Sequence, residues 1–204
     1  MAEQIQILKL INLIWPGNFS SCKFSKCLLY FYGRLAAKTE PELILDNVKI
    51  KIIVIGKTHK KFLEEGEREY LNRLQRYMQT EIVMIPDIKN AKNMTIDQIK
   101  EAEGKLILSK IEKGGLVVLL DEKGKEYDSV QFAKWTQERM NRGLKHITFV
   151  VGGPYGFSAE VYQAGQQKLA LSKMTFSHQM IRLFFIEQLY RAFTILKNEP
   201  YHHQ

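Results

Sequence analysis

The segment Val48-Lys-Ile-Lys-Ile-Ile-Val-Ile-Gly56 is rich in β-branched residues and ends at a glycine. β-Branched side chains fit the pleated backbone of a strand, and glycine commonly ends one. The segment therefore predicts a buried first strand. Toward the C-terminus, short apolar runs predict further strands at residues 81–85, 116–120, 146–151 and 169–171.

Amphipathic segments separate these strands. Apolar residues at helical spacing predict helices over residues 60–78, 95–113, 129–142 and 179–197, and a shorter helix from Ser158. Thr95 and Gln98 have the spacing of a capping box at the start of the second helix.

The alternation of strands and helices indicates an α/β fold with a largely parallel sheet that helices cover on both faces. Sheets of this kind bind ligands at the carboxyl ends of their strands. The loops that follow Leu120, Val151 and Leu171 are therefore the expected ligand-binding positions.

Lysine and arginine outnumber aspartate and glutamate by 30 to 22, which gives a net charge of +8. This excess favours a polyanionic partner, most simply nucleic acid, although basic enzymes that bind no nucleic acid are common. The two cysteines, Cys22 and Cys27, lack the further ligands of a metal site and indicate a reducing cytoplasm. No apolar run approaches the roughly 20 residues that span a bilayer, so we expect no membrane segment.

Residues 1–47 differ from the rest because they show no helix or strand period. They hold 5 basic and 4 acidic residues, against 25 and 18 from Val48 onward, so the basic character belongs to residues 48–204. We interpret residues 1–47 as an N-terminal extension that is disordered or results from a start placed too far upstream, since a GUG start codon would be read as valine. A genuine extension that packs on the main domain is the alternative.

The loop Gly152-Gly-Pro-Tyr-Gly156 lies between a predicted strand and a predicted helix. Its backbone can pass close to a ligand and present amide groups to it. It matches neither G-x-G-x-x-G nor G-x-x-x-x-G-K-[ST], so neither a dinucleotide fold nor a nucleoside triphosphate loop is predicted. A tight turn without a ligand is an equally consistent interpretation.

The long helix over residues 179–197 is apolar on most sides, so it must pack against the sheet, a partner chain or both. Arg182, Glu187 and Arg191 on this helix then need partners or a ligand, unless they line a solvated stripe. We expect a homodimer interface here, because one small sheet cannot cover all of Leu183, Phe184, Phe185, Ile186, Leu189 and Phe193.

Several segments together are similar to the ribosomal RNA large subunit methyltransferase H family. They are Lys49-Ile-Lys-Ile-Ile-Val-Ile-Gly-Lys57, Leu119-Leu-Asp-x-x-Gly-Lys125, Val150-Val-Gly-Gly-Pro-x-Gly156, Leu171-Ser-Lys-Met-Thr-Phe-x-His178, Arg182, Glu187-Gln-Leu-Tyr-Arg-Ala-Phe193 and Pro200-Tyr-His202. The resemblance covers residues 48–202 in order and with the spacing of the family, so it is more specific than any single motif.

The resemblance implies a SPOUT fold with a C-terminal trefoil knot, a cytoplasmic homodimer, and methylation of N3 of a pseudouridine in 23S ribosomal RNA within the ribosome. It implies S-adenosylmethionine as the methyl donor and no metal. The donor would be held, largely by backbone, at the matching positions Leu120, Gly153, Ser172, Lys173, Met174, Thr175, Phe176 and Ser177. Members often carry proline where this chain has Ser177 and vary at Tyr155, both of which are loop positions.

The terminal Tyr201 and His202 match a Tyr-His pair of the family and are the expected catalytic residues. They would position the target base or assist proton loss from its weakly acidic imide nitrogen. A frayed terminus without a role is the alternative. Arg182 and Arg191 are expected at phosphate or cross-subunit contacts, and His178 as a helix cap or a packed loop residue.

Two other functions stay open at this stage. A non-catalytic RNA-binding or ribosome-associated factor would explain the basic charge and would need no donor pocket. A SPOUT methyltransferase that acts on tRNA would keep the fold and the donor, because substrate choice lies in surface detail.

Overall fold

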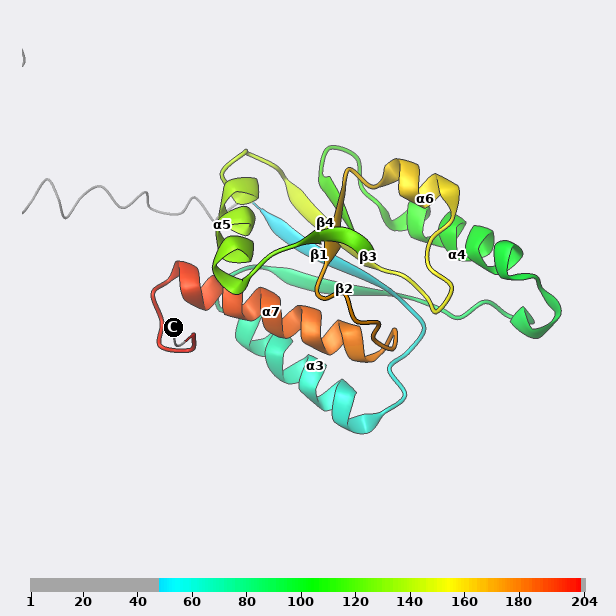
Figure 1. Ribbon diagram of the computed structural model, residues 1–204, viewed down its shortest axis with the longest axis horizontal. Coiled ribbons are helices and arrows are strands. Elements are labelled where there is room, and N and C mark those ends of the chain that lie inside the picture. Colours follow the sequence, from blue (N-terminus) through cyan, green and yellow to red (C-terminus); the bar gives the residue numbers. More distant parts are fainter. Residues whose placement is uncertain (1–47, 203–204) are drawn as a thin grey trace, which may run out of the picture. The chain divides into compact units, whose positions relative to one another are not determined.

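The computed structural model describes residues 48–202, so the expectations for residues 1–47 lie outside the described residues. Five strands form one sheet in the order β2-β1-β4-β3-β5, and each neighbouring pair is parallel (Figure 1). The strands are β1 (Lys49–Ile55), β2 (Thr80–Ile85), β3 (Leu116–Glu126), β4 (His146–Val151) and β5 (Gln167–Ala170). The predicted α/β fold with a parallel sheet is confirmed.

Helices cover both faces of this sheet. They are α3 (Lys61–Leu74), α4 (Ile96–Lys110), α5 (Ser129–Met140), α6 (Ala159–Ala164) and α7 (Met180–Leu196), with a 3-10 turn at Ala91–Asn93. Figure 1 shows α3, α5 and α7 on one face of the sheet, and α4 with α6 on the other. Between residues 48 and 202, no helix combines the length and the apolar character needed to cross a membrane.

Two apolar cores result from this arrangement, and β1 supplies both by simple alternation. Ile52 and Val54 belong to the core beneath α3, α5 and α7, whereas Ile53 and Ile55 belong to the core beneath α4 and α6. Successive side chains of a strand point to opposite faces, so the part of a strand that is covered on both sides is apolar at successive positions. This explains the continuous apolar run from Ile52 to Ile55, which follows the lysines at positions 49 and 51.

The helix ends follow local hydrogen-bonding rules. The capping box predicted at Thr95 and Gln98 is present, and a second one, at Asp128 and Gln131, begins α5. The helix predicted over residues 60–78 ends at Leu74 instead. There the backbone tightens, because Tyr77 N–H donates to the Leu74 carbonyl at 3.0 Å, three residues back.

The chain's own elements cover most of the apolar surface of α7. This helix lies against both α3 and α5 (Figure 1), and Phe185, Ile186, Leu189 and Phe193 are buried in the first core. Of the six apolar side chains expected at a dimer interface, Phe184 is the exposed one, at 42%. The argument for a dimer from an uncovered helix is therefore wrong, although the dimer itself stays a prediction.

Arg182 of α7 is the largest fully buried side chain among the described residues, with 1% exposure. Its Nη1 donates to the Gly56 carbonyl at 3.0 Å and to Thr58 Oγ1 at 3.2 Å, and its Nη2 donates to the Ile55 carbonyl. Its Nε donates to the His178 carbonyl at 3.0 Å. The guanidinium thus ties the start of α7 to the carboxyl end of β1.

Thr58 extends this connection to α3. Its hydroxyl accepts from Arg182 and donates to the Glu67 carboxylate, whose oxygens lie 3.0 Å and 3.1 Å away. Burial raises the pKa of Glu67, while the hydrogen bond from Thr58 and the charge of Arg182 act in the opposite direction. Each polar group around the buried arginine therefore has a partner, which is the condition for burying a charge at a tolerable cost.

We expect Arg182→Met to lower the free energy of unfolding by about 3 kcal/mol, because it leaves buried carbonyls of β1 without donors. Urea denaturation followed by circular dichroism measures this loss. Arg68→Met removes an exposed arginine of α3 and serves as the control, with an expected change within about 0.5 kcal/mol. Equal stabilities of the two variants would contradict the structural role of Arg182.

Candidate functional site

A cavity of about 390 Å³ opens at the carboxyl ends of β3, β4 and β5. Three segments supply most of its lining, namely residues 120–123, residues 151–157, and residues 169–178 without Lys173 and Ser177. They meet because β4, β3 and β5 are neighbours in the sheet. These are the loops that the sequence predicts at ligand-binding positions, and the volume falls within the range of roughly 300–1,000 Å³ typical of small-molecule sites.

A bulge in β3 forms the first wall of this cavity. Leu169 of β5 pairs both with Leu120 and, after a register shift, with Lys125, so the intervening residues leave the ladder. The sequence predicts that the strand ends at Leu120, whereas β3 continues to Glu126 beyond the bulge. The expected loop is therefore an interruption within one strand.

Asp121 organises the bulge and joins it to α6. Its Oδ1 accepts the Lys123 N–H at 2.8 Å, and its Oδ2 accepts the Tyr162 hydroxyl at 2.5 Å. Burial, followed by this bond to Asp121, raises the pKa of Tyr162 to about 12. The Lys168 ammonium lies 4.4 Å from the centre of the Tyr162 ring, which adds a cation–π contact on the same side chain.

The glycine loop forms the second wall. Gly156 has a φ of 80°, a conformation that side chains with a Cβ rarely adopt, and its N–H donates to the Gly153 carbonyl at 3.2 Å. A Cβ placed at Gly156 would meet nothing within 4 Å. The loop is thus a closed turn whose backbone lines the cavity without a covering side chain at Gly156.

Gly153 is required for a different reason, which is close contact with α4. A Cβ at this position would lie 2.7 Å and 3.0 Å from the carboxyl oxygens of Glu103. Glu103 is 6% exposed, and its Oε2 has no hydrogen-bond partner in the described part of the chain. Burial raises the pKa of Glu103, and the negative charge of Asp87 raises it further.

The third wall is the segment between β5 and α7. The Ser172 hydroxyl accepts the Met174 N–H at 3.0 Å, and Met174 itself is 74% exposed. The Phe176 ring packs edge-on against Phe184 of α7, with centroids 5.1 Å apart. Ser177 accepts the Met180 N–H at 3.2 Å and so caps the first turn of α7.

His178 lies where this wall enters α7. Its carbonyl holds Arg182, and its side chain is part of the cavity lining. Burial lowers the pKa of His178, and the positive charge of Arg182 lowers it further. Burial and Arg182 thus both favour the neutral imidazole. His178 is a packed loop residue, as expected, and also part of the cavity wall.

The structure brings most of the expected donor-binding residues to one place. Those in the cavity lining are Leu120, Gly153, Ser172, Met174, Thr175 and Phe176. Lys173 and Ser177 belong to the same loop but are exposed outside the lining.

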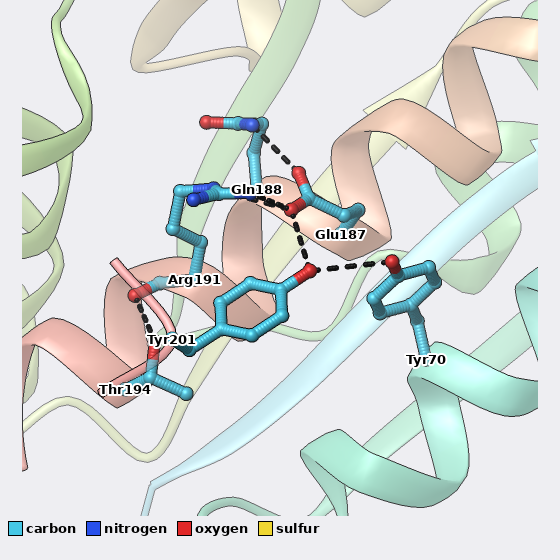
Figure 2. A network of polar contacts seen from close by, with 6 residues as sticks. All are labelled: Tyr70, Glu187, Gln188, Arg191, Thr194 and Tyr201. Carbon is cyan, nitrogen blue, oxygen red and sulfur yellow. Dashed lines mark hydrogen bonds and ion pairs between the residues drawn. The ribbon is translucent and has the colours of Figure 1, made fainter. Parts of the chain in front are cut away.

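The expected catalytic residues lie elsewhere in this chain, and Tyr201 belongs to the network drawn in Figure 2. The Tyr201 hydroxyl donates to Glu187 Oε1 at 3.0 Å and lies 3.2 Å from the Tyr70 hydroxyl. Its ring packs edge-on against Tyr190 at 4.8 Å. Burial and these hydrogen bonds raise the pKa of Tyr201, so its phenol stays protonated.

Arg191 belongs to the same network. Its Nε and Nη2 donate to Glu187 Oε1 at 3.1 Å and 2.5 Å, and its guanidinium carbon lies 4.7 Å from the centre of the Tyr201 ring (Figure 2). Arg191 stays partly exposed, whereas Arg182 is buried against backbone carbonyls. Arg182 is therefore not available on the protomer surface for the phosphate contact that the sequence suggests.

Neither Tyr201 nor His202 lines the cavity. Tyr201 is anchored at Glu187, six residues along α7 from Ile181 of the cavity, which corresponds to about 9 Å along the helix axis. His202 follows at the end of the described chain and is half-buried. The cavity and the tail formed by Tyr201 and His202 are thus two separate sites in this chain.

Three residues of the site escape the reasoning from sequence, namely Asp121, Tyr162 and Glu103. Asp121 belongs to the Leu119-Leu-Asp-x-x-Gly-Lys125 motif, which supports the family resemblance but does not indicate a role for this aspartate. Tyr162 and Glu103 lie on helices, where their spacing resembles that of ordinary amphipathic positions. Only the packing of α4 and α6 on the sheet shows that they approach the cavity.

A parallel sheet with a glycine-lined cavity at its strand ends defines an α/β protein that is built to bind a small ligand there. The family described as "Predicted SPOUT methyltransferase" matches residues 48–202. The chain belongs to the SPOUT methyltransferase family. This confirms the SPOUT class inferred from the motifs, while the trefoil knot stays a prediction.

Two curated relatives agree with this assignment. The chain is 59% identical over 155 residues to the ribosomal RNA large subunit methyltransferase H of Christiangramia forsetii, with 76% of this chain and 99% of that protein covered. It is 57% identical over 157 residues to the protein of the same name from Parabacteroides distasonis, with 77% and 100% covered. Among solved structures, one described as "a probable methylase family protein" from Haemophilus influenzae gives a TM-score of 0.46 at 14% identity, over 76% of this chain and 68% of that one.

The raised pKa of Tyr162 predicts how stability changes in alkali. The phenol keeps its proton more tightly in the fold than in the unfolded chain, so its contribution is present below pH 10 and is lost as the pH rises toward about 12. We expect Tyr162→Phe to melt lower than the wild type at neutral pH, because a hydrogen bond worth about 1 kcal/mol is lost. The gap in melting temperature should narrow between pH 10 and 12.

Thermal melting across this pH range measures the effect. Tyr155→Phe, which changes an exposed tyrosine of the same cavity, is the matched control and should behave as the wild type. A gap between Tyr162→Phe and the wild type that stays constant in alkali would show that the hydroxyl of Tyr162 does not titrate as described.

Proposed function

We propose that this chain is an S-adenosylmethionine-dependent methyltransferase that methylates N3 of a pseudouridine in 23S ribosomal RNA, acting on the ribosome in the cytoplasm as a homodimer. The observation that carries the proposal is the strand-end cavity, whose walls coincide with the donor positions implied by the motifs. Relatives that are 57–59% identical carry the name ribosomal RNA large subunit methyltransferase H. The net charge of +8 suits a nucleic-acid substrate.

The residues of the cavity fit such a donor. S-Adenosylmethionine combines a flat apolar base, a polar ribose and a charged amino acid, and the lining offers both kinds of surface. Leu120 and Phe176 are apolar, Ser172 and Thr175 are polar, and Gly156 presents bare backbone. In the described part of the chain, no group of His, Cys, Asp or Glu is arranged to hold a metal ion.

When bound, the donor supplies an activated methyl group on a positively charged sulfur. The role of the protein is to hold the methyl group in line with the acceptor nitrogen and to exclude water. This positioning supplies much of the rate enhancement in such transfers. The backbone around Leu120, Gly153 and residues 172–177 would hold the donor. Arg182 supports this by fixing the His178 carbonyl, and thus the end of the third wall.

The acceptor nitrogen must lose a proton as it is methylated. Tyr201 keeps its own proton, because its pKa is raised, so it suits stacking on or hydrogen bonding to the base instead of accepting a proton. His202, beside it, is the proposed residue for assisting proton loss. Arg191, with part of its side chain exposed, is proposed to contact the RNA or the partner chain.

The separation of these two sites supports the proposed homodimer. Because the tail of one protomer does not line its own cavity, the tail of a second protomer would have to reach the cavity to act there. Exposed apolar side chains lie at the third wall and the adjoining face of α7, where Phe184 packs on Phe176 near Met174. We propose this surface as part of the dimer interface, because exposed apolar groups of this kind favour protein contacts.

The proposed function is tested in two steps. Calorimetric titration with S-adenosylmethionine is expected to show binding, and absence of binding would favour a non-catalytic RNA-binding factor. Methyl transfer is then compared on unmethylated ribosomes, free 23S ribosomal RNA and tRNA, with the product nucleoside identified by mass spectrometry. Methylation of tRNA alone would refute the proposed substrate.

For the tail, we expect His202→Ala to bind the donor with unchanged affinity and to lose about 100-fold or more in methyl transfer. Tyr201→Phe removes the hydroxyl and keeps the ring, so it should lose less. Parallel titration and single-turnover transfer measure the two properties. A loss of donor affinity in His202→Ala would show that the tail closes the donor pocket instead.

Mixed dimers test whether the tail acts on the partner's cavity. We combine His202→Ala chains with Gly153→Asp chains, in which the new carboxylate collides with Glu103 and disrupts the donor loop. If each site uses the cavity of one chain and the tail of the other, mixing restores about a quarter of wild-type activity by random pairing. No recovery on mixing would place both parts of a site in the same chain.

The proposed interface predicts that Phe184→Glu shifts the dimer toward monomer, because a charge replaces an apolar contact. Light scattering after size exclusion at micromolar concentration measures the mass. Met84→Glu, on the edge strand β2 and similarly exposed, is the control that should stay dimeric. A Phe184→Glu dimer as stable as the wild type would move the interface elsewhere.

A further inference from the structure

The Oε2 atom of Glu103 takes no part in hydrogen bonding among residues 48–202. The side chain lies on the buried side of α4 and is 6% exposed. Burying an ionisable group without a partner costs free energy, and an apolar side chain of similar length would fill the same space without that cost. The position therefore calls for a role other than stability.

The Glu103 carboxyl group lies against the glycine loop at Gly153. An oxygen that is 2.7 Å from a Cβ at Gly153 is no more than about 4.2 Å from the Gly153 α-carbon, since one carbon–carbon bond of about 1.5 Å separates the two positions. Gly153 itself lines the cavity. One layer of backbone, with no side chain, therefore separates the carboxyl group from whatever binds there.

The surroundings of Glu103 oppose its ionisation on the protein side. Burial raises its pKa, and the neighbouring charge that acts on it is the negative one of Asp87. A positive charge that favours ionisation of Glu103 could therefore act from the side of Gly153 and the cavity. A cation in the cavity would stabilise the carboxylate, and the carboxylate would stabilise the cation in return.

We propose that Glu103 is a positioning residue that senses the positive charge of the donor sulfur through the Gly153 backbone, and so favours S-adenosylmethionine over its product. This rests on the proposed function. S-Adenosylhomocysteine, the product, keeps the nucleoside and amino-acid groups of the donor but has a neutral thioether. The charge of Glu103 therefore changes the affinity for S-adenosylmethionine relative to that for S-adenosylhomocysteine.

The size of this preference follows from the separation. A ligand atom in contact with the cavity side of the loop lies about 4 Å beyond the backbone, hence roughly 8 Å from the carboxylate. At an effective dielectric constant of about 20, and with solvent near the cavity mouth, unit charges at this distance change affinity by about tenfold. Release of the neutral product is then faster than release of the donor, which suits turnover.

The test compares two ligands on three chains. Calorimetric titrations at mildly alkaline pH give the affinities of wild type, Glu103→Gln and Glu101→Gln for S-adenosylmethionine and S-adenosylhomocysteine. Glu101→Gln removes an exposed carboxylate two residues away on α4 and controls for the change in net charge. We expect Glu103→Gln to weaken donor binding about tenfold and to leave product binding within about twofold.

Other outcomes are equally informative. Equal weakening of both ligands by Glu103→Gln would show that Glu103 only shapes the loop, and unchanged affinities would show no role, so either result overturns the proposal. If Glu103→Gln does not fold, Glu103→Met replaces it, because this variant removes the buried polar group altogether. The quantity compared is again the ratio of the affinities for S-adenosylmethionine and S-adenosylhomocysteine. A wild-type chain that binds neither ligand would refute the proposed function itself, which is a different result from a changed ratio.

Discussion

The hydrogen bonds of the Arg182 guanidinium are the interaction on which the site depends. They join the segment from Ile55 to Thr58, at the carboxyl end of β1, to the His178 carbonyl, which is far away in the sequence. Because a buried guanidinium tolerates few unsatisfied donors, its position fixes these acceptors within narrow limits. The start of α7 and the end of the third cavity wall are therefore held against the sheet by one side chain.

The strand order imposes a second constraint, which acts together with the first. β5 reaches the edge of the sheet beside β3, so the chain leaves β5 next to the bulge around Asp121 and near the glycine loop. Parallel strands present their carboxyl ends on the same side, so three loops that are distant in sequence converge there. Arg182 then closes the arrangement by anchoring the segment that follows β5. The cavity at these strand ends results from the topology and from a single buried charge.

Much of this arrangement could be predicted from the sequence, because strand-end loops follow from strand positions. The apolar runs located β1, β2 and β4 closely, and the capping residue Thr95 located the start of α4. Features that depend on packing between distant segments could not be predicted. Whether Arg182 faces solvent or backbone depends on where β1 ends relative to α7. From the sequence alone, the charge of Arg182 suggested a contact on the protein surface. The coverage of Phe185 and Leu189 likewise depends on α3 and α5 flanking α7, which periodicity within one helix does not reveal.

The two proposed halves of the site differ in how they tolerate sequence change. Ser177 lies outside the cavity lining, so its side chain is not needed to shape the cavity proposed for the donor. Its hydroxyl accepts the Met180 N–H and starts α7 by a side-chain cap, and it does so outside the cavity lining. The tail is defined by side chains, because Tyr201, Gln188 and Arg191 all share the carboxylate of Glu187 (Figure 2). Replacing Glu187 would leave the side chains of Tyr201, Gln188 and Arg191 without this common acceptor. The position of the tail therefore depends on the identity of residue 187.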